Sequence, residues 1–451
     1  MDGRIVAKFG GSSLADSSQY KKVKTIVVEN PNRKFIVPSA PGRRFKGDHK
    51  ITDLLYMCHQ LSSHGIHFGE VFQLIRERYM EICKGLGLKT PIEEILDEVY
   101  DNIHKGASRD YCASRGEYIN GILLADFLNM AFVDAAEVIR FDLKGDYDEG
   151  RTEKLLSEKL SKLGGVVIPG FYGGDENGNI ITFPRGGSDI TGSIVANAID
   201  AKLYENWTDV PGFLMVDPNI VENPKPIREI TYEELRGLSY MGAPVLHEEA
   251  IFPVRKKGIP IQIRNTNKIE DEGSLIVHSR LSKTNLGKIT GIAGKKGFTV
   301  LSIEKTLMTA EKGFLRKLVS VFESNDIYIE HMPSSIDSIS VIVAEDEIKG
   351  KIDKIMEEIR IYCKPDRITP YTNMALLAVV GSGMIRTKGI SARIFTALYE
   401  SDINIRMISQ GSSELSIIIG VENDDYEKSV KAIYKAFIDY TRYNWKNTNE
   451  K

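Results

Sequence analysis

The sequence predicts an α/β protein in which a three-layer αβα sandwich is followed by two small ferredoxin-like βαββαβ units. Apolar, β-rich runs alternate with helix-length segments through the first half, which indicates parallel strands with helices on both faces. An internal repeat of 76 residues fills most of the second half. The chain has 451 residues, more than one hydrophobic core usually organises, so we expect two or three domains.

The strands expected in the first half are short apolar segments. They lie at 4–9, 34–38, 136–140, 165–169, 201–207 and 259–263. Apolar residues at helical spacing in 91–105 and 151–163 predict two of the covering helices. We expect these elements to form one domain over residues 1–285.

The two copies of the repeat in the second half align without gaps around their glycine turns and first helices. Gly313 and Leu318 recur as Gly389 and Ile394, at a constant offset. Each unit is expected to contain a strand, a glycine turn, a helix, two strands and a second helix. Small units of this type have exposed sheet edges and tend to pair side by side, so we expect a ligand-binding module that forms dimers.

The two units differ at their ends. A strand-like segment, 366–371, follows the first unit, whereas the second ends after its helix in a polar tail. An unassigned strand at 288–292 precedes the first unit, and we expect it to cross over and complete the second. The first domain of the pair would then cover 298–372, inserted into a second made of 286–297 plus 373–445.

Composition excludes several classes of protein. Hydrophobic residues make up 42% and charged residues 27%, the balance of a soluble folded chain. Fifty-nine Lys and Arg against 62 Asp and Glu give a net charge of -3, so no nucleic-acid partner is expected. No apolar run is long enough to span a membrane, and the four cysteines form no Cys-x-x-Cys pair. A cytoplasmic protein without a membrane partner is expected.

The first polar motif is KFGGSS, residues 8–13, directly after the first expected strand. Two glycines there let the backbone approach an anion closely, and successive N–H groups can form a nest for phosphate oxygens. The motif is neither a P-loop nor a dinucleotide fingerprint, and by itself it fits a simple glycine hinge better than a phosphate site. Further polar loops follow strand ends at 38–42 and 207–212, and ligands bind at this edge of open α/β sheets.

Two other motifs contain side chains suited to an amino-acid ligand. RGGSD, residues 185–189, offers a guanidinium for a carboxylate and a helix start that favours anions; the alternative is that Asp189 only caps the helix. SRGE, residues 114–117, precedes an apolar helical run, and there Glu117 could complete a capping box with Ser114.

Together these motifs resemble the aspartokinases. KFGGSS, SAPG with KITDLL, SRGE, PRGGSD, WTDVPGF followed by VDP, and GAPVLH occur in the order and spacing of that family, over residues 4 to about 280. The repeat resembles the paired ACT domains that follow in the family. The resemblance therefore implies an amino-acid-kinase-like sandwich followed by two ACT domains.

The resemblance also implies an activity and a set of site residues. Aspartokinases use ATP with Mg²⁺ to phosphorylate the side-chain carboxylate of L-aspartate to 4-phospho-L-aspartate, the first step of lysine, threonine and methionine biosynthesis. The implied catalytic residues are Lys8 and Asp189. The implied substrate-binding residues are Ser39, Thr52, Glu117, Arg185, Gly187 and Ser188. The implied nucleotide-binding residues are Lys8, Gly10, Gly11, Ser12, Thr208, Asp209, Asp217 and Lys268.

Regulation by an amino acid is implied as well. The residues that resemble the effector pocket of lysine-inhibited aspartokinases are Met308, Gly313, Phe314, Leu315, Glu330 and Ser335. We expect lysine as the effector, with threonine as the alternative, and a homodimer through the ACT domains that could pair into a tetramer. A packed helix start with a surface glutamate would explain the same residues without a ligand.

Two other functions fit part of the pattern. A kinase of the same superfamily could act on glutamate, carbamate or UMP, and a sensor could keep the fold without catalysis. Glu117 with Arg185 and the paired repeats disfavour the first, and the presence of Lys8, Asp189 and both glycine motifs disfavours the second.

Overall fold

A computed structural model describes residues 3–184, 186–242, 248–279 and 289–438. Contacts divide the chain into two compact units. The first contains residues 1–213, 226–232 and 245–280, and the second contains 214–225, 233–244 and 281–451. Within the described ranges, no helix combines the length and the apolar character needed to cross a bilayer.

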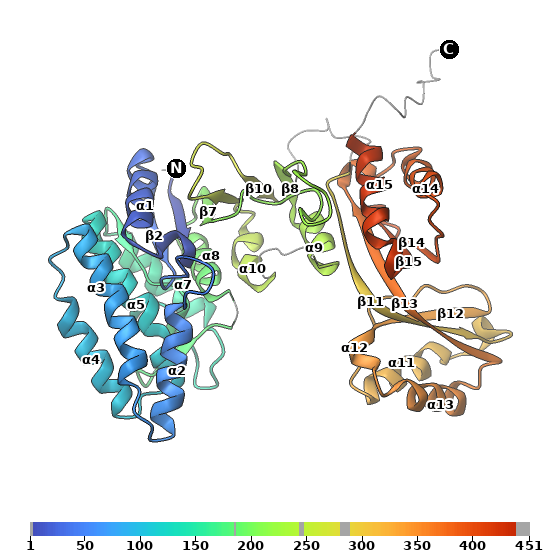
Figure 1. The fold of residues 1–451 in the computed structure, drawn as a ribbon, viewed down its shortest axis with the longest axis horizontal. Helices are drawn as coiled ribbons and strands as arrows, with labels where there is room; N and C mark the ends of the chain where they lie inside the picture. The colour runs from blue at the N-terminus through green and yellow to red at the C-terminus, as the bar shows by residue number, and fades with distance from the viewer. Residues whose placement is uncertain (1–2, 185, 243–247, 280–288, 439–451) are drawn as a thin grey trace, which may run out of the picture. The chain divides into compact units, whose positions relative to one another are not determined.

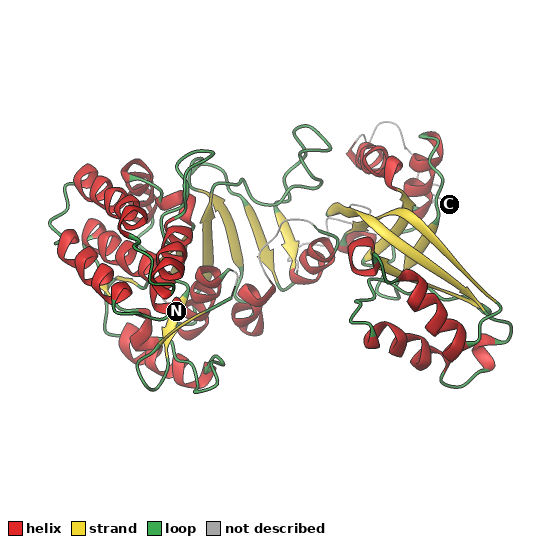
Figure 2. Cartoon of the chain, turned by 60° about the horizontal axis from the view of Figure 1, so that its bottom comes forward, coloured by secondary structure: helices red, strands yellow, loops and turns green. Residues whose placement is uncertain are grey.

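The first unit is built on an eight-stranded sheet (Figure 2). The strand order is β3-β4-β2-β1-β7-β9-β10-β8, and all neighbouring pairs are parallel except β9 with β10. The strands are β1 Ile5–Phe9, β2 Arg33–Pro38, β3 Ala131–Phe132, β4 Val166–Val167, β7 Leu203–Thr208, β8 Glu229–Thr231, β9 Ile261–Asn265 and β10 Ser274–Val277.

Helices cover both faces of this sheet (Figures 1 and 2). Successive residues of a strand point to opposite faces of the sheet. The contacts of the β1 side chains therefore show which helices cover each face. Ala7 and Phe9 lie in a core with the first five helices, whereas Lys8 contacts the start of α8. The first layer contains α1 Ser17–Glu29, α2 Ile51–Ser63, α3 Gly69–Leu86, α4 Ile92–His104 and α5 Arg109–Leu128, and the second contains α7 Glu149–Leu160, α8 Gly187–Ala198 and α10 Glu248–Lys257. The predicted three-layer sandwich is confirmed.

One expected strand of this unit is wrong. Residues 136–140 do not form a strand, because Asp134 accepts a hydrogen bond from the backbone N–H of Ala136 and caps a short helix, α6 Ala135–Val138. The strand at this edge of the sheet is β3, which precedes that cap. The strands β8 and β10 and the hairpin formed by β5 Tyr172–Gly174 and β6 Ile180–Thr182 were not predicted.

The second unit contains a five-stranded antiparallel sheet in the order β12-β11-β13-β15-β14. The strands are β11 Gly291–Glu304, β12 Ser338–Ala344, β13 Arg367–Val380, β14 Met407–Gln410 and β15 Ser416–Glu422. The helices are α9 Tyr232–Tyr240, whose first residue belongs to the first unit, α11 Phe314–Ser324, α12 Glu345–Ile348, α13 Ile352–Cys363, α14 Ile390–Glu400 and α15 Tyr426–Ile438. Two separate cores pack against this sheet, one around α11 and α13 and one around α14 and α15.

A carboxylate fixes the start of the glycine turn in each repeat. In the first repeat, Asp366 accepts hydrogen bonds from the backbone N–H and the hydroxyl of Thr306, at 2.6 and 2.8 Å. The equivalent residue of the second repeat is Ser382, whose N–H donates to Glu234 Oε1 at 2.6 Å. Glu234 lies on α9 and also accepts from Thr290 Oγ1 at 2.7 Å. A side chain from outside the second repeat therefore does what Asp366 does within the first.

Candidate active site

The loops that follow β1, β2, β7 and β9 meet at one edge of the parallel sheet. Hydrogen bonds join them in pairs: Gly10 N–H donates to the carbonyl of Trp207 at 2.9 Å, and Ser39 N–H donates to the carbonyl of Phe9 at 3.0 Å. The N–H of Thr266, after β9, donates to the carbonyl of Thr208, at the end of β7, at 2.8 Å. The convergence expected at the carboxyl ends of the strands is therefore present.

The glycine turn at this edge is fixed on both sides. It forms a single 3₁₀ turn, η1 Gly11–Leu14, and the N–H of Gly42 donates to the carbonyl of Gly11 at 2.8 Å. A Cβ on Gly42 would lie 2.6 Å from the carbonyl carbon of Gly11, so the two backbones touch. On the other side, the hydroxyls of Ser13 and Thr266 share a hydrogen bond of 2.7 Å. These contacts hold the turn on both sides.

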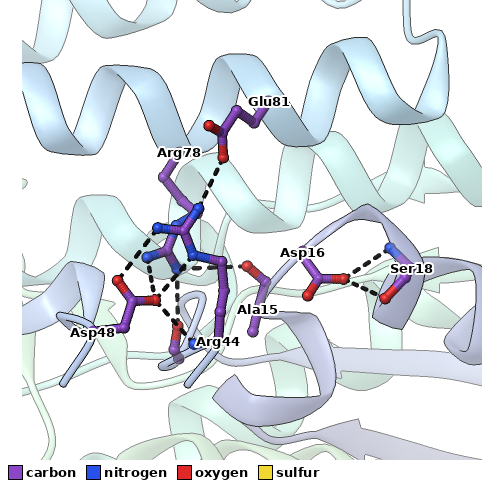
Figure 3. A network of polar contacts seen from close by, with 8 residues as sticks. Ala15, Asp16, Ser18, Arg44, Asp48, Arg78 and Glu81 are labelled. Atoms are coloured by element: carbon purple, nitrogen blue, oxygen red, sulfur yellow. Dashed lines mark hydrogen bonds and ion pairs between the residues drawn. The ribbon is translucent and has the colours of Figure 1, made fainter. Parts of the chain in front are cut away.

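A buried ion pair supports the loop that carries Gly42 (Figure 3). Arg78 on α3 is 4% exposed, and it donates to the carbonyl of Gly42 at 2.9 Å and to Asp48 Oδ2 at 2.6 Å. Asp48 also accepts from the guanidinium and the backbone N–H of Arg44. Burial favours the protonated form of Asp48, but the hydrogen bonds from Arg44 outweigh it and hold the pKa of this carboxyl well below its usual range. The loop is thus held rigidly against the glycine turn.

Lys8 and Asp189 form an ion pair beside this turn. The Lys8 ammonium, on a residue that is 8% exposed, lies 2.5 Å from Asp189 Oδ1. Asp189 is in the first turn of α8, whose N-cap is Gly186 with φ 77°, and its Oδ1 contacts Lys8 and Asn206. The interpretation of Asp189 as a helix cap is therefore wrong. The amide of Asn206 contacts both charged groups, and sequence reasoning did not find it.

Glu117 is a buried carboxyl group with an unused acceptor. Helix α5 begins at Arg109 with Ser108 as its N-cap, so Glu117 lies inside the helix and the capping-box interpretation with Ser114 is wrong. Glu117 is 5% exposed, and its Oε2 has no hydrogen-bond partner among the described residues. Burial raises the pKa of Glu117 to about 8, although the backbone N–H of Ala40 and the charges of nearby Arg115 and Lys8 act in the opposite direction.

The remaining predicted site residues have the following positions. Ser39 directly follows β2, Thr52 is in the first turn of α2, and Gly187 and Ser188 open α8. Gly10 and Ser12 belong to the glycine turn, Thr208 ends β7 and donates to Asp209 Oδ1 at 3.2 Å, and Lys268 is exposed after β9. Arg185 lies outside the described residues. Asp217 belongs to the second unit, where it accepts from the N–H of Asn219 at 2.8 Å.

The predicted effector residues all lie in the second unit. Met308 and Phe314 are buried in the core of the first repeat, and Gly313, with φ 83°, is the N-cap of α11. Leu315 is 49% exposed, Ser335 is exposed, and the backbone carbonyl of Glu330 accepts from the Tyr240 hydroxyl at 2.6 Å. Core packing thus accounts for two of the six, and the other four remain candidates for contact with a ligand.

In the part of the chain that the structure describes, His, Cys, Asp and Glu nowhere gather in a group of three or more that could hold an ion.

Comparison with known proteins extends these observations. Residues 3–265 match the amino acid kinase family, and residues 377–437 match an ACT domain. Aspartokinase 3 of Bacillus subtilis is 39% identical over 448 residues, which cover 96% of this chain and 98% of the relative.

Solved structures show the same likeness. The crystal structure of Clostridium acetobutylicum aspartate kinase is 56% identical, with a TM-score of 0.89 over 96% of this chain and 99% of the other. Two structures of Escherichia coli aspartokinase III are 25% identical. The complex with aspartate and ADP, called the R-state, has a TM-score of 0.70 over 96% of this chain and 99% of the other. The complex with lysine and aspartate, called the T-state, has a TM-score of 0.71 over 97% and 100%.

Proposed function

Because this chain belongs to the aspartokinase family, we propose that its sheet edge binds ATP and L-aspartate and transfers the γ-phosphoryl group to the aspartate side chain. The observation that carries the proposal is the grouping of the Lys8–Asp189 ion pair, the fixed glycine turn and the unpaired Glu117 oxygen at this edge. The product would be 4-phospho-L-aspartate, which opens the route to lysine, threonine and methionine.

The reaction needs positioning and charge neutralisation more than proton transfer. An oxygen of the aspartate β-carboxylate forms a bond to the γ-phosphorus, and the bond from that phosphorus to the β,γ-bridging oxygen breaks, so that ADP leaves with the electron pair. The nucleophile is already ionised at neutral pH, so no base is required. The barrier comes from bringing two anions together, which preorganised positive charge and N–H donors lower.

Lys8 supplies the positive charge in this proposal. In the described structure its ammonium is paired with Asp189, and a bound nucleotide would offer phosphate oxygens in competition with that carboxylate. At an effective dielectric constant of about 20, a unit charge about 4 Å away contributes roughly 4 kcal/mol, which offsets much of the repulsion. Gly10, Gly11 and Ser12 would add N–H or hydroxyl donors to the phosphates.

Glu117 and Arg185 would select an amino acid. The unpaired Oε2 of Glu117 is a buried acceptor suited to the α-ammonium of aspartate, and that cation would stabilise the carboxylate form. Arg185 would bind the α-carboxylate in a bidentate manner. Ser39 in the loop after β2, Gly187 and Ser188 in the first turn of α8 and Thr52 in the first turn of α2 would complete the contacts.

The nucleotide would extend along the ends of β7 and β9. Thr208 ends one strand and Asp209 follows it, and Lys268 follows the next strand, so these residues suit the ribose and phosphates. The family resemblance adds Asp217 as a further candidate. Magnesium would enter as part of the substrate MgATP, held by the phosphate oxygens of the nucleotide.

We further propose lysine as the inhibitor, bound by the second unit. The predicted pocket has a glycine turn at the start of α11 and an acidic residue, Glu330, suited to a cationic side chain. The lysine complex of the E. coli enzyme supports this choice over threonine. The domains would be two ACT repeats, the first inserted into the second, and the pairing of Gly291 on β11 with Val380 on β13 supports that arrangement. These repeats would form the homodimer, with a tetramer as a further step.

The four cysteines are compatible with the cytoplasmic location that we propose. Cys58, Cys83, Cys112 and Cys363 are all buried free thiols. A reducing compartment keeps such residues unpaired.

One assay separates the proposed function from its rivals. ADP release from ATP is followed with aspartate, with glutamate and without an acceptor. We expect release that depends on aspartate, whereas activity with glutamate indicates another superfamily kinase, and no activity indicates a sensor. Isothermal titration with lysine and with threonine tests the effector: heat from threonine and none from lysine would reverse the choice.

A further inference from the structure

Asn206 lies between the two charged groups of the candidate active site. It is on β7, directly opposite Lys8 in the register of the β1–β7 pair, and both side chains leave the sheet on the face that α8 covers. Its Nδ2 donates to Asp189 Oδ1 at 2.9 Å, and its Oδ1 accepts from Lys8 Nζ at 3.4 Å. With the direct Lys8–Asp189 contact of 2.5 Å, three side chains from β1, β7 and α8 form a closed ring.

The position of this amide is unusual for its residue type. Asn206 is 3% exposed in the middle of a central strand, where asparagine is depleted and a buried amide is costly without partners. Tyr204, two residues earlier on the same face, donates its hydroxyl to the backbone carbonyl of Asp189 at 3.1 Å. An amide has a donor for the anion and an acceptor for the cation, and neither an aliphatic nor a carboxylate side chain has both.

We propose that Asn206 is a positioning residue for phosphoryl transfer, which holds Lys8 and Asp189 in place while the ammonium is passed to the nucleotide. This inference rests on the proposed aspartate kinase activity. When the Lys8 ammonium turns toward a phosphate oxygen, Asp189 loses its strongest donor. The Nδ2 group of Asn206 continues to donate to Asp189, and its Oδ1 continues to hold Lys8, so the pair separates without leaving either group unpaired.

The test replaces the amide by an acid of the same shape. In Asn206→Asp, two carboxyl groups would lie at hydrogen-bond distance, so they cannot both ionise easily and one retains a proton. The protonated acid reproduces the amide, because its O–H donates to Asp189 and its carbonyl accepts from Lys8. The kcat of the variant should therefore approach that of the unchanged chain at low pH and fall as the pH rises through the ionisation of the pair.

Other charged groups near the ring also affect how kcat depends on pH. Lys8 on β1 and Asp189 on α8 face the substituted side chain, and Glu117 on α5 is close enough to Lys8 for the ammonium to lower its pKa. Glu117 also loses its proton as the pH rises, but its ionisation has the opposite effect on activity, because it is the carboxylate form that binds substrate. Measuring kcat with saturating aspartate and ATP isolates the alkaline limb that the variant adds.

A matched control is available on the same helix as Asp189. Asn197 on α8 is also 3% exposed, and its Nδ2 donates to a carboxylate, Glu153 Oε1, at 2.6 Å. Asn197→Asp places an acid beside an acid in the same way, more than two helical turns from Asp189. It should lower the thermal unfolding temperature comparably but add no limb to the kcat profile.

A second variant tests the proposal if the Asn206→Asp protein does not fold. Asn206→Leu removes both polar contacts and leaves Lys8 free to pair with Asp189 alone. We expect kcat to fall about 10- to 100-fold, the usual effect of losing a supporting contact behind a reacting group, with KM for aspartate within about threefold. An alkaline limb in Asn206→Asp or this selective loss of kcat in Asn206→Leu supports the proposal.

Two different results would contradict the positioning role and the proposed function separately. An unchanged pH profile in Asn206→Asp, together with kcat within twofold in Asn206→Leu, would overturn the positioning role while the unchanged chain still phosphorylates aspartate. Absence of aspartate-dependent ADP release in the unchanged chain would instead overturn the proposed function, so the two failures are separable.

Discussion

Gly11 and Gly42 touch through their backbones, at 2.8 Å between the N–H nitrogen of Gly42 and the carbonyl oxygen of Gly11. A Cβ on Gly11 would lie 2.8 Å from the carbonyl oxygen of Ala40, and one on Gly42 would lie 2.6 Å from Gly11 itself. Both obstacles are main-chain atoms, which cannot turn aside as a flexible side chain can. The glycine turn after β1 and the loop after β2 therefore form one rigid wall of the candidate site.

The first prediction concerns this wall. Gly42→Ala should destabilise the chain by about 1–3 kcal/mol, because the added methyl group forces the two loops apart. The same displacement should raise KM for ATP, since it moves the N–H groups of the turn. Gly164→Ala is the control, because a Cβ there meets nothing within 4 Å. Thermal unfolding and steady-state kinetics check both variants, and equal behaviour of the two would show that the close approach has no consequence.

The second prediction concerns Lys8. Lys8→Met should lower kcat by at least about 100-fold, because it removes the one preorganised cation that the proposal places at the transferred group. The fold should persist, since Asp189 keeps the donor from Asn206. Lys24→Met, an exposed lysine over the Phe127 ring on α5, is the control for losing a lysine. Circular dichroism and ADP release measure the outcome, and a Lys8→Met variant with activity similar to that of Lys24→Met would remove Lys8 from the mechanism.

The third prediction is a pH dependence set by Glu117. Its pKa of about 8 means that the free protein loses the carboxylate as the pH falls through that value. The carboxylate is the form that binds the α-ammonium, so kcat/KM for aspartate should fall about tenfold per pH unit below about 8. Bound aspartate favours the carboxylate, so kcat should persist to lower pH. Glu117→Gln should weaken the binding free energy of aspartate by about 2 kcal/mol or more, and its kcat/KM should not show this fall below about pH 8.

The stability of the same variant gives an independent check on Glu117. A carboxyl group whose pKa is raised on folding binds more protons in the folded state than in the unfolded state between its two pKa values. Its contribution to stability is therefore fully present below the unfolded value, near 4.5, and is lost as the pH rises to about 8. The unfolding temperature should fall more between pH 5 and pH 9 for the unchanged chain than for Glu117→Gln. If the unfolding temperatures of the two proteins change in parallel with pH, folding does not raise the pKa of Glu117.

The fourth prediction compares the two carboxylates that fix the glycine turns of the second unit. Glu234 is fully buried, so Glu234→Ala leaves the N–H of Ser382 without this acceptor and should cost about 2–3 kcal/mol. Asp366 makes the equivalent contact with Thr306 but is exposed, so water can replace it and Asp366→Ala should cost less. Urea unfolding of the two variants measures the difference. A larger loss for Asp366→Ala would contradict the assignment of Glu234 as the support of the second repeat.

Much of the architecture could be predicted because its signals are local. The apolar runs at 4–9 and 34–38 contain β1 and nearly all of β2, and the strand-like segment at 366–371 contains the start of β13. The loops that meet at the sheet edge could be anticipated as well, because parallel strands place their carboxyl ends together. Lys8 and Asp189 follow from that rule and from the family motifs.

The errors arose where a polar side chain outside the motif decides the structure. Ser108 caps α5 six residues before Ser114, so the SRGE motif lies inside a helix and not at its start. Asp134 caps a helix where β-rich residues favoured a strand.

Contacts between distant parts of the chain could not be anticipated from local patterns. Asn206 pairs with a lysine 198 residues earlier, and Glu234 with an amide 148 residues later. Such partners depend on strand register and on how the helices pack. The one signal available in the sequence was an asparagine within an otherwise strand-like run, 203–208.

The structure of the chain bound to aspartate and a non-hydrolysable ATP analogue tests the central claim most directly. We predict that the Lys8 ammonium leaves Asp189 for a γ-phosphate oxygen and that the α-ammonium of aspartate contacts Glu117 Oε2, with both ligands at the edge formed by the ends of β1, β2 and β7. A nucleotide whose phosphates lie away from this edge, or an aspartate whose ammonium does not reach Glu117, would contradict it.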